Sequence, residues 1–307
     1  LDDLVRGEVV FPEGVVGDFV VLRSNGLPTY NFACAVDDTA MQITHVIRAE
    51  EHLPNTPRQL MVCAALGRTP PRYAHVPLIL NRDRTKMSKR QGEASAAVGD
   101  WRRAGVVPEA LLGYLALLGF HPGDEREVLS RAELLECFDL ARVGRSGSIF
   151  DADKLRWTNA HVLHHASGAE LDNWAAGTLP DAARALPEIE RRRLLEAVRG
   201  NLSTLADLDA ELAPFLAERP GLEPDAAAAL AGDGARALCG ELATALADLA
   251  EWNEEGVKST VRAVGARLGV RGRELFQPAR AALTGRLHGP ELPLVAGRDS
   301  GPFVPDA

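Results

Sequence analysis

Cysteine is scarce in this 307-residue sequence, and its four cysteines stand far apart. Cys34, Cys63, Cys137 and Cys239 form no C-x-x-C pair, and no histidine lies near one of them at ligand spacing. Structural zinc sites are built from such local groups, so the pattern argues against a zinc site of this kind. Scattered cysteines fit reduced thiols, and we therefore expect a cytoplasmic protein.

Long hydrophobic runs are also missing. No run approaches the ~18 apolar residues that a membrane-spanning helix needs, so we expect no membrane partner. The first residues, LDDLVRGEVV, lack a signal-peptide pattern, and no Met begins the sequence, so we interpret the chain as a fragment or a processed form. Neither G-x-x-x-x-G-K-[ST] nor a strand-linked G-x-G-x-x-G is present, which argues against two other classes of nucleotide-binding enzyme.

Positive charge is in deficit overall but is concentrated in one segment. The net charge of −9 argues against indiscriminate nucleic-acid binding. Residues 82–92, RDRTKMSKRQG, nevertheless hold five cationic side chains and one anionic side chain. A local surface of this kind can engage phosphates whatever the total charge, because the local potential decides the contact.

The pattern of apolar and turn-forming residues predicts an α/β part followed by an all-α part. Residues 17–26 are β-rich and end in Asn-Gly, which is a hairpin signal. Residues 29–38 form an apolar run, and we expect Asp37 and Asp38 to follow a strand in a turn or capping role, not a metal role. Residues 55–67 have the signals of a helix, and residues 74–83 contain another short strand.

Helical signals dominate after Gly92. Residues 107–120 carry an apolar helical stripe, and Ser130 with Glu133 has capping-box spacing. Residues 150–163 predict another capped helix. From about residue 170, alanine and leucine recur at helical spacing and aromatic residues are scarce, which predicts a helical bundle. Residues 291–307 are rich in proline and glycine and should be irregular.

Residues 86–90, KMSKR, resemble the KMSKS signature of class I aminoacyl-tRNA synthetases. Two lysines beside a serine on a loop after a strand can reach a triphosphate and offset charge on the α-phosphate and the leaving pyrophosphate. The alternative is a solvated lysine-rich loop, the usual role of a short charge run. Context favours the first interpretation, because residues 26–67 and 73–90 are similar in order and spacing to glutamyl-tRNA synthetases.

Further segments similar to that family are VPEALLGYLALLGF, FDADKLRWTNAHVL and LFQPARAALTG. The resemblance implies the second half of a Rossmann-like class I catalytic domain followed by a helical anticodon-binding bundle. It divides the chain into the end of an acceptor-stem-binding insertion, half of the catalytic domain with the KMSKR loop, a stem-contact junction, the anticodon-binding domain and a tail, at residues 1–17, 18–92, 93–168, 169–290 and 291–307.

The resemblance also implies roles for individual residues. Tyr30, Cys34 and Arg48 would line the glutamate pocket, with Cys34 as a wall and not a nucleophile. The alternative for Tyr30 is a core aromatic residue, and the alternative for Arg48 is an ion pair with Glu50 or Glu51. Arginine suits a carboxylate because its planar fork can donate two hydrogen bonds. ATP would bind Glu51, His52, Lys86, Met87, Ser88, Lys89 and Arg90, and the catalytic set would be Lys86, Ser88 and Lys89.

For tRNA binding, the resemblance indicates Arg199, Asn201, Arg271, Arg273 and Arg280, although most arginines of the bundle would be solvated helix-face charges. Discriminating members of the family read the third anticodon base with an arginine, and Asn201 aligns with it. We therefore expect a chain that accepts tRNA(Glu) and also tRNA(Gln). The implied substrates are L-glutamate and ATP with Mg²⁺, no metal site belongs to this chain, and we expect a monomer.

One signature of the family is missing, because none of the eight histidines begins an H-x-G-H pattern. We interpret the chain as the C-terminal part of a glutamate–tRNA ligase that is inactive alone. The alternative is a non-catalytic paralogue that still binds tRNA. A purely helical RNA-binding module would explain the second half of the chain but not residues 20–92.

Overall fold

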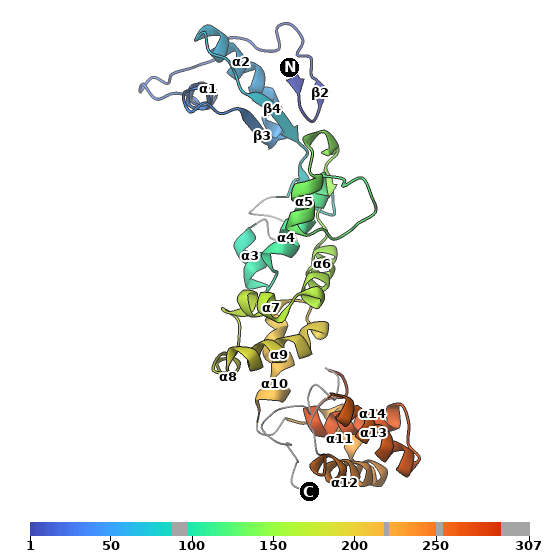
Figure 1. Cartoon of the computed structure of the whole chain (residues 1–307). Helices are drawn as coiled ribbons and strands as arrows, with labels where there is room; N and C mark the ends of the chain where they lie inside the picture. The colour runs from blue at the N-terminus through green and yellow to red at the C-terminus, as the bar shows by residue number, and fades with distance from the viewer. Residues whose placement is uncertain (88–96, 218–220, 250–253, 290–307) are drawn as a thin grey trace. The chain divides into compact units, whose positions relative to one another are not determined.

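The computed structural model describes residues 1–87, 97–217, 221–249 and 254–289 (Figure 1). The chain divides into two compact units, one of Leu1–Trp101 with Pro108–Thr158 and one of Arg102–Val107 with Asn159–Ala307. The first unit contains both strands and helices, whereas the described residues of the second unit form helices and no strands. This confirms the predicted α/β and all-α classes. No helix within the described ranges has the length and apolar character to cross a bilayer.

A four-stranded sheet organises the first unit, with strand order β2-β1-β4-β3. Its strands are β1 (Asp2–Asp3), β2 (Gly7–Glu8), β3 (His45–Ala49) and β4 (Arg72–Val76). Strand β4 lies parallel to both β1 and β3, and Arg48 of β3 is opposite His75 of β4. Because parallel strands end at the same edge of a sheet, Arg48 and His75 both lie near its carboxyl-terminal edge.

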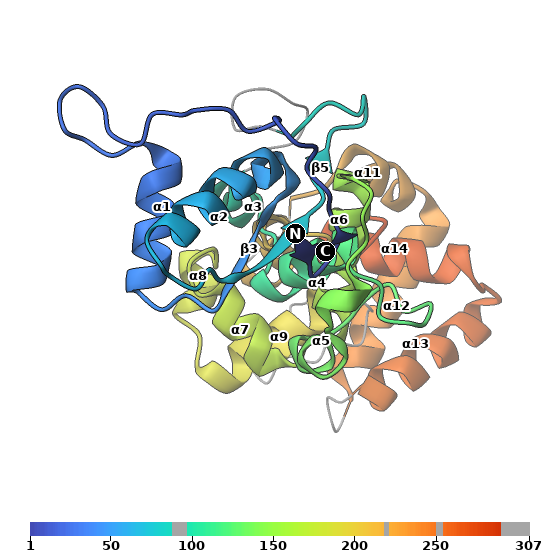
Figure 2. The same ribbon diagram turned by 90° about the horizontal axis from the view of Figure 1, so that it is seen from above.

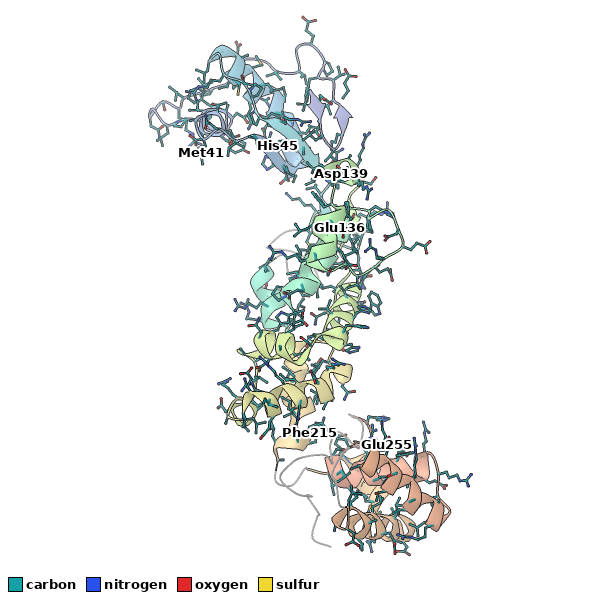
Figure 3. The ribbon with its side chains drawn as sticks, viewed as in Figure 1. Met41, His45, Glu136, Asp139, Phe215 and Glu255 are labelled. Carbon is teal, nitrogen blue, oxygen red and sulfur yellow. The ribbon has the colours of Figure 1, made fainter. Side chains whose placement is uncertain are left out.

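Two helices, α1 (Tyr30–Ala40) and α2 (Thr56–Ala65), lie side by side in both views (Figure 1, Figure 2). They pack through Ala35, Val62 and Cys63, which are buried. Helix α1 ends at Ala40, the exposed Met41 follows as its C-cap, and the chain then enters β3 at His45 (Figure 3). The short 3-10 helix η1 (Glu50–Asn55) leads from β3 into α2, and Gly67 follows α2 with φ +62°, as a helix stop predicts.

The prediction of a strand before Asp37 and Asp38 is wrong, because both residues lie within α1. The run TYNFACAVDD has too little period-2 alternation to be a half-buried strand. Its Phe32 and Ala35 are three residues apart, which places them on one helix face against α2. The aspartates thus take neither of the roles expected after a strand.

Two hairpin-like segments leave the first unit's sheet. The Asn25-Gly26 turn is present, with the Arg23 N–H donating to the Leu27 carbonyl at 2.8 Å, but only one isolated bridge, Leu22 to Pro28, accompanies it. The regular strand pairing expected there is absent from the described structure of residues 17–26. After β5 (Ile79–Leu80), residues 79–87 turn back so that the Met87 N–H donates to the Ile79 carbonyl at 3.0 Å.

The remaining elements of the first unit include the helices predicted from sequence. Ser130 and Glu133 form the expected capping box at the start of α5. The Asp151 side chain accepts the backbone N–H groups of Asp153 and Lys154 at 2.9 and 3.2 Å and caps α6. The bounds are α3 (Val98–Arg103), α4 (Pro108–Gly119), α5 (Arg131–Cys137), η2 (Leu140–Arg142), β6 (Ser148–Ile149), which pairs with β5, and α6 (Ala152–His165); α3 and α6 each contribute residues to both units.

The second unit is a succession of helices, as predicted. Their bounds are α7 (Gly168–Ala175), α8 (Asp181–Arg184), α9 (Glu188–Val198), η3 (Arg199–Asn201), η4 (Leu205–Asp207), α10 (Leu208–Leu216), α11 (Pro224–Leu230), α12 (Asp233–Ala247), α13 (Glu254–Leu268) and α14 (Arg273–Thr284). Residues 291–307, expected to be irregular, lie outside the described ranges.

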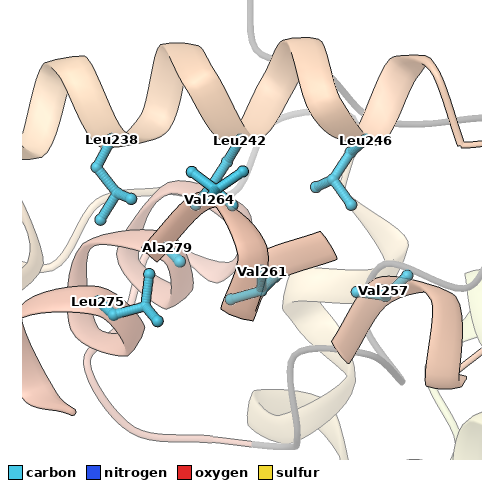
Figure 4. Packing of buried hydrophobic residues seen from close by; sticks show 8 residues of the cluster. All are labelled: Leu238, Leu242, Leu246, Val257, Val261, Val264, Leu275 and Ala279. Atoms are coloured by element: carbon cyan, nitrogen blue, oxygen red, sulfur yellow. The ribbon is translucent and has the colours of Figure 1, made fainter. Parts of the chain in front are cut away.

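A leucine- and valine-rich cluster joins α12, α13 and α14, which lie together in the view from above (Figure 2, Figure 4). Leu238, Leu242 and Leu246 recur every four residues of α12, so they share one helix face. They pack against Val257, Val261 and Val264 of α13 and Leu275 and Ala279 of α14. This spacing explains why the periodicity of the sequence was sufficient to predict these helices.

Candidate amino-acid and nucleotide site

Arg48 is held by hydrogen bonds on two of its three nitrogen atoms. Its Nε donates to His75 Nε2 at 3.1 Å, and its Nη2 donates to Thr56 Oγ1 at 2.8 Å and to Gln59 Oε1 at 2.9 Å. Its guanidinium carbon lies 5.3 Å from the centre of the Tyr73 ring, within the range of a cation–π contact. None of these three hydrogen bonds uses Nη1, and a further side-chain hydrogen bond joins Arg48 to Tyr30, so Nη1 is the nitrogen that lies outside the buried network.

The alternative of an ion pair between Arg48 and its acidic neighbours is wrong. Glu50 pairs with Arg6 and accepts the Leu78 N–H at 3.3 Å, and Glu51 pairs with Lys86. The Arg48 guanidinium is bound instead to neutral side chains. This arrangement leaves its positive charge available to a carboxylate, but through one nitrogen and not through the two-nitrogen fork that the sequence suggested.

Behind Arg48, a buried carboxylate holds the other side of His75. Asp3 Oδ2 lies 2.6 Å from His75 Nδ1, and both side chains are fully buried. Asp3 also accepts the backbone N–H groups of Val5, Arg6 and His75 at 3.0 to 3.2 Å. Burial alone would raise the pKa of Asp3, but these donors bring it below its usual value, so the carboxylate stays ionised.

Tyr30 lies close to Arg48, Cys34 and His52. The Tyr30 hydroxyl is 3.4 Å from His52 Nδ1, and Cys34 is one turn from Tyr30 on α1. Burial raises the pKa of Tyr30, the neighbouring Cys34 acts in the same direction, and Arg48 opposes them. Tyr30 is half exposed, so it is not the core aromatic residue of the alternative interpretation.

The hairpin of residues 79–87, which we call the basic hairpin, is joined to the residues near Tyr30 by an ion pair. Lys86 bonds to Glu51, and this hydrogen bond is the main cause that lowers the pKa of the Glu51 carboxyl. Glu51 in turn lies 4.0 Å from His52, which joins the hairpin to the Tyr30 group. Met87 is half-buried at the end of the described hairpin, and Ser88, Lys89 and Arg90 lie outside the described residues.

A shallow groove of about 700 Å³ lies at the opposite end of the same strands. It is lined by Thr39, Ala40, Gln42, Ile43, Thr44, His45, Arg68, Thr69, Pro70, Pro71 and Arg72. His45 and Arg72 begin β3 and β4, whereas ligands of open α/β sheets bind beyond the carboxyl ends of the strands. We therefore place the candidate site at Arg48 and Tyr30 and not in this groove.

The candidate RNA contacts of the second unit differ in their accessibility. Arg271 and Arg273 are exposed at the start of α14. Arg199 donates to the Ala166 carbonyl at 2.8 Å, and Arg280 donates to the Gly289 carbonyl at 2.7 Å. Asn201 donates to Glu211 at 2.8 Å. Arg271 and Arg273 are thus the two members of the set best placed to meet a phosphate without first leaving a partner.

The sequence did not indicate four of the polar residues at this site. Asp3, Thr56, Gln59 and His75 are almost completely buried; the last three contact Arg48, and Asp3 contacts His75. The only available signal was a histidine within the apolar run YAHVPLIL, where a buried imidazole requires a partner. Asp3 is 72 residues from His75, and nothing in its own neighbourhood distinguished it from Asp2.

Stability should fall in mild acid because of His75. Burial lowers the pKa of the His75 imidazole, and Arg48 and Arg6 act in the same direction against the opposing effect of Asp3. An unfolded histidine titrates near pH 6.5, so the unfolded state binds more protons just below that pH. The contribution of His75 to the free energy of unfolding is therefore fully present above about pH 6.5, and it declines as the pH falls towards the lower pKa of the folded state.

Thermal unfolding of the wild-type chain and of His75→Gln between pH 7.5 and 5.5 measures this effect. The pKa of His161 is also lowered by burial, but His161 titrates in both proteins, so the difference between them isolates His75. We expect the wild-type Tm to fall more than that of the variant over this range. Equal pH dependence of the two Tm values would contradict the assignment.

Comparison with known proteins places this geometry in a family. The model of the catalytic domain of class I tRNA synthetases (E and Q) matches residues 1–157, and an anticodon-binding domain matches residues 169–296. A glutamate–tRNA ligase of Carboxydothermus hydrogenoformans is 42% identical over 301 residues, covering 95% of this chain and 62% of the relative. Glutamate–tRNA ligase 2 of Syntrophus aciditrophicus is 42% identical over 293 residues, covering 94% of this chain and 60% of its own length.

A solved structure of a glutamate tRNA ligase is also similar to this chain. The crystal structure of a glutamate tRNA ligase from Elizabethkingia meningosepticum, in complex with its amino acid, superposes with a TM-score of 0.80 at 27% identity. The superposition covers 96% of this chain and 62% of the ligase chain, so the present sequence spans about three fifths of the length of the proteins it matches. The family model matches about half of the chain, including every residue of the cluster around Arg48. The chain belongs to the class I tRNA synthetases (E and Q).

Proposed function

We propose that this chain is a part of a glutamate–tRNA ligase, which joins L-glutamate to tRNA at the expense of ATP. The observation that carries the proposal is the meeting of Arg48, Tyr30 and the Lys86–Glu51 pair at the carboxyl edge of the sheet. A carboxylate-binding guanidinium therefore lies beside a basic hairpin that can reach phosphates. Both groups are needed in an enzyme that activates an amino acid with a nucleotide.

In the proposed reaction, the α-carboxylate of glutamate attacks the α-phosphate of ATP, and pyrophosphate leaves. Nη1 of Arg48 donates to a carboxylate of the substrate, and Tyr30 and Cys34 shape the pocket around it. Lys86, Ser88 and Lys89 balance the charge that develops on the phosphates, and Glu51, His52, Met87 and Arg90 bind the nucleotide. A ribose hydroxyl of the terminal adenosine of tRNA then attacks the carbonyl of the glutamyl-adenylate, gives up its proton, and displaces AMP, without a covalent enzyme intermediate.

Magnesium enters this scheme with ATP as part of the substrate. Among the described residues, no group of three histidine, cysteine, aspartate or glutamate side chains is arranged to hold a metal ion. The phosphates of ATP would supply the ligands for Mg²⁺, which commonly binds through phosphates and water. The role proposed for this part of the enzyme is to orient the substrates and to stabilise charge.

We propose the functional division of the chain as the sequence suggested it. Residues 1–17 would end the acceptor-stem-binding insertion, residues 18–92 would complete the catalytic domain, and residues 93–168 would contact the tRNA stem. Residues 169–290 would bind the anticodon, and residues 291–307 would form a tail. The separate matches to residues 1–157 and 169–296 support the boundary near residue 168. We further propose a cytoplasmic monomer.

Aminoacylation tests the proposal directly. The test protein combines this chain with the part of the Carboxydothermus relative that lies outside the matched region, and we call this combination the complemented enzyme. It should attach radioactive glutamate to tRNA(Glu) in the presence of ATP, whereas this chain alone should not. Binding of tRNA by the complemented enzyme without attachment of glutamate would favour a non-catalytic tRNA-binding relative instead.

Selection between tRNAs should depend on Asn201. Its side chain is neutral and bonded to Glu211, so it lacks the rigid donor fork with which an arginine would select one base. We expect the complemented enzyme to charge both tRNA(Glu) and tRNA(Gln). Asn201→Arg should lower the relative kcat/KM for tRNA(Gln) about tenfold, the discrimination expected from one bidentate contact to a base.

The two purified tRNAs, charged in parallel by wild type and variant, provide the measurement. Asn173→Arg is the matched control, because it places the same side chain on α7 of the same unit. It should leave the ratio of the two kcat/KM values unchanged. Strict rejection of tRNA(Gln) by the wild-type complemented enzyme would contradict the prediction.

A further inference from the structure

Arg48 is oriented by a chain of buried polar groups that extends away from the candidate pocket. Asp3, His75, Thr56 and Gln59 are each at most 2% exposed. Burying a carboxylate and an imidazole is costly, and apolar residues of similar volume would commonly pack there at no loss of stability. The pairing of β3 with β4 runs through their main chains and does not need the side chains of His75, Thr56 or Gln59, whereas Asp3 also accepts the His75 backbone N–H of β4. A role in fixing Arg48 explains their presence.

The first link of this chain sets the tautomer of His75. Asp3 Oδ1 is occupied by the N–H groups of Val5 and Arg6, and Oδ2 is 2.6 Å from His75 Nδ1. A carboxylate that is ionised can only accept hydrogen bonds, so Nδ1 must carry the proton. In the neutral ring, Nε2 is then a bare acceptor.

The second link sets the direction of the guanidinium. Nε of Arg48 is always a donor, and its partner at 3.1 Å is His75 Nε2. With the other tautomer, or with a protonated ring, two N–H groups would face each other and the contact would be lost. The hydrogen bonds from Nη2 to Thr56 and Gln59 then fix the orientation of the guanidinium plane, so that Nη1 points away from the network.

We propose that Asp3 and His75 are positioning residues, which hold the Arg48 guanidinium with Nη1 directed at the substrate carboxylate. This inference rests on the proposed function for the identity of the ligand, but the alignment of Arg48 is a property of this chain. It assigns a role to two residues that touch no substrate. It also explains why Arg48 offers only one nitrogen to the pocket.

The test is nitrogen NMR of the chain labelled at histidine and arginine with ¹⁵N. In the wild type, His75 should show a protonated Nδ1 and an unprotonated Nε2. Asp3→Asn replaces the acceptor with a group that can donate, so the proton should move to Nε2. Exchange of the Arg48 Nε–H with water should then become about tenfold faster, as expected for loss of a hydrogen bond to a charged group.

Asp2→Asn is the matched control, because Asp2 carries the same charge on the same strand but is exposed. It should leave the His75 tautomer and the Arg48 signal unchanged. A wild-type His75 with its proton on Nε2 would overturn the proposal. So would a tautomer change in Asp3→Asn that leaves Arg48 exchange unaffected.

A second pair of variants covers the case in which Asp3→Asn fails to fold. His75→Gln keeps a side-chain oxygen that can accept from Arg48, whereas His75→Leu removes the acceptor at similar volume. The glutamine variant should retain the slow exchange of the Arg48 Nε–H, and the leucine variant should lose it. Equal exchange in the two variants would show that the imidazole does not position Arg48.

Titration of glutamate into the complemented enzyme separates this inference from the proposed function. If glutamate shifts the Arg48 Nη signals in the wild type but equally in Asp3→Asn, the positioning role fails while the glutamate site stands. If glutamate leaves those signals unmoved while Asp3→Asn still frees the Nε–H, the positioning stands and Arg48 is not the glutamate contact. A shift in the wild type that weakens in Asp3→Asn is the result we expect.

Discussion

Arg48→Lys is expected to lower kcat/KM for glutamate about a hundredfold in the complemented enzyme, which corresponds to about 2.7 kcal/mol. Arg48 makes side-chain hydrogen bonds to His75, Thr56 and Gln59. A lysine ammonium cannot satisfy these acceptors and the substrate carboxylate at once, because it is a single point charge on a flexible stem. Buried acceptors left unpaired would each cost about 1–3 kcal/mol. Steady-state ATP–pyrophosphate exchange at varied glutamate measures the ratio.

Arg68→Lys provides the control for that experiment. Arg68 donates to the Thr39 hydroxyl at 3.0 Å and the Val36 carbonyl at 3.3 Å, and it is exposed away from Tyr30. The same chemical change there should alter kcat/KM by less than about twofold, as is usual for surface substitutions. An Arg48→Lys variant that matches this control would remove Arg48 from the glutamate site.

Leu242→Ala should destabilise the helical cluster of the second unit by about 3 kcal/mol. Leu242 is 5% exposed in the centre of the α12 stripe, between Leu238 and Leu246 (Figure 4). Removing its side chain takes away apolar contacts with α13 and α14 and leaves a cavity that three packed helices cannot fully close. Hydrogen exchange of the amides of these helices measures the loss locally.

The comparison for this variant is Leu222→Ala in the same unit. Leu222 is 55% exposed, so its truncation should change the free energy of unfolding by less than about 0.5 kcal/mol. Equal hydrogen exchange in Leu222→Ala and Leu242→Ala would mean that the α12 stripe does not form the core of this cluster. Aminoacylation by Leu242→Ala should weaken through tRNA binding, because the cluster belongs to the proposed anticodon-binding part.

Local signals were sufficient to predict most helices. Ser130 and Glu133 form their capping box within four residues of sequence, and Leu238, Leu242 and Leu246 mark one face of α12 by spacing alone. The start and stop of α2 also follow from Pro57 and Gly67, which act through their own backbone preferences. In each case the physical cause lies within a few residues, so a single sequence contains it.

Longer-range causes were not available from the sequence. Residues 30–40 form a helix because Phe32 and Ala35 find a partner face on α2, which a short apolar run does not reveal. The partners of Arg48 include His75, 27 residues away, and Asp3 lies 72 residues before His75. Only the parallel pairing of β1, β4 and β3 brings them together. The family resemblance indicated Arg48 itself but not the residues that orient it.

Glutamate-dependent ATP–pyrophosphate exchange, with tRNA present, tests the central claim most directly. The samples are this chain, the complementing part of the Carboxydothermus relative, and the complemented enzyme, with Tyr30 and Arg48 of this chain intact. We predict exchange in the complemented enzyme only, with kcat/KM for glutamate lowered about a hundredfold when Arg48 is replaced by lysine. Exchange by this chain alone, or undiminished exchange in the Arg48→Lys complemented enzyme, would contradict the account.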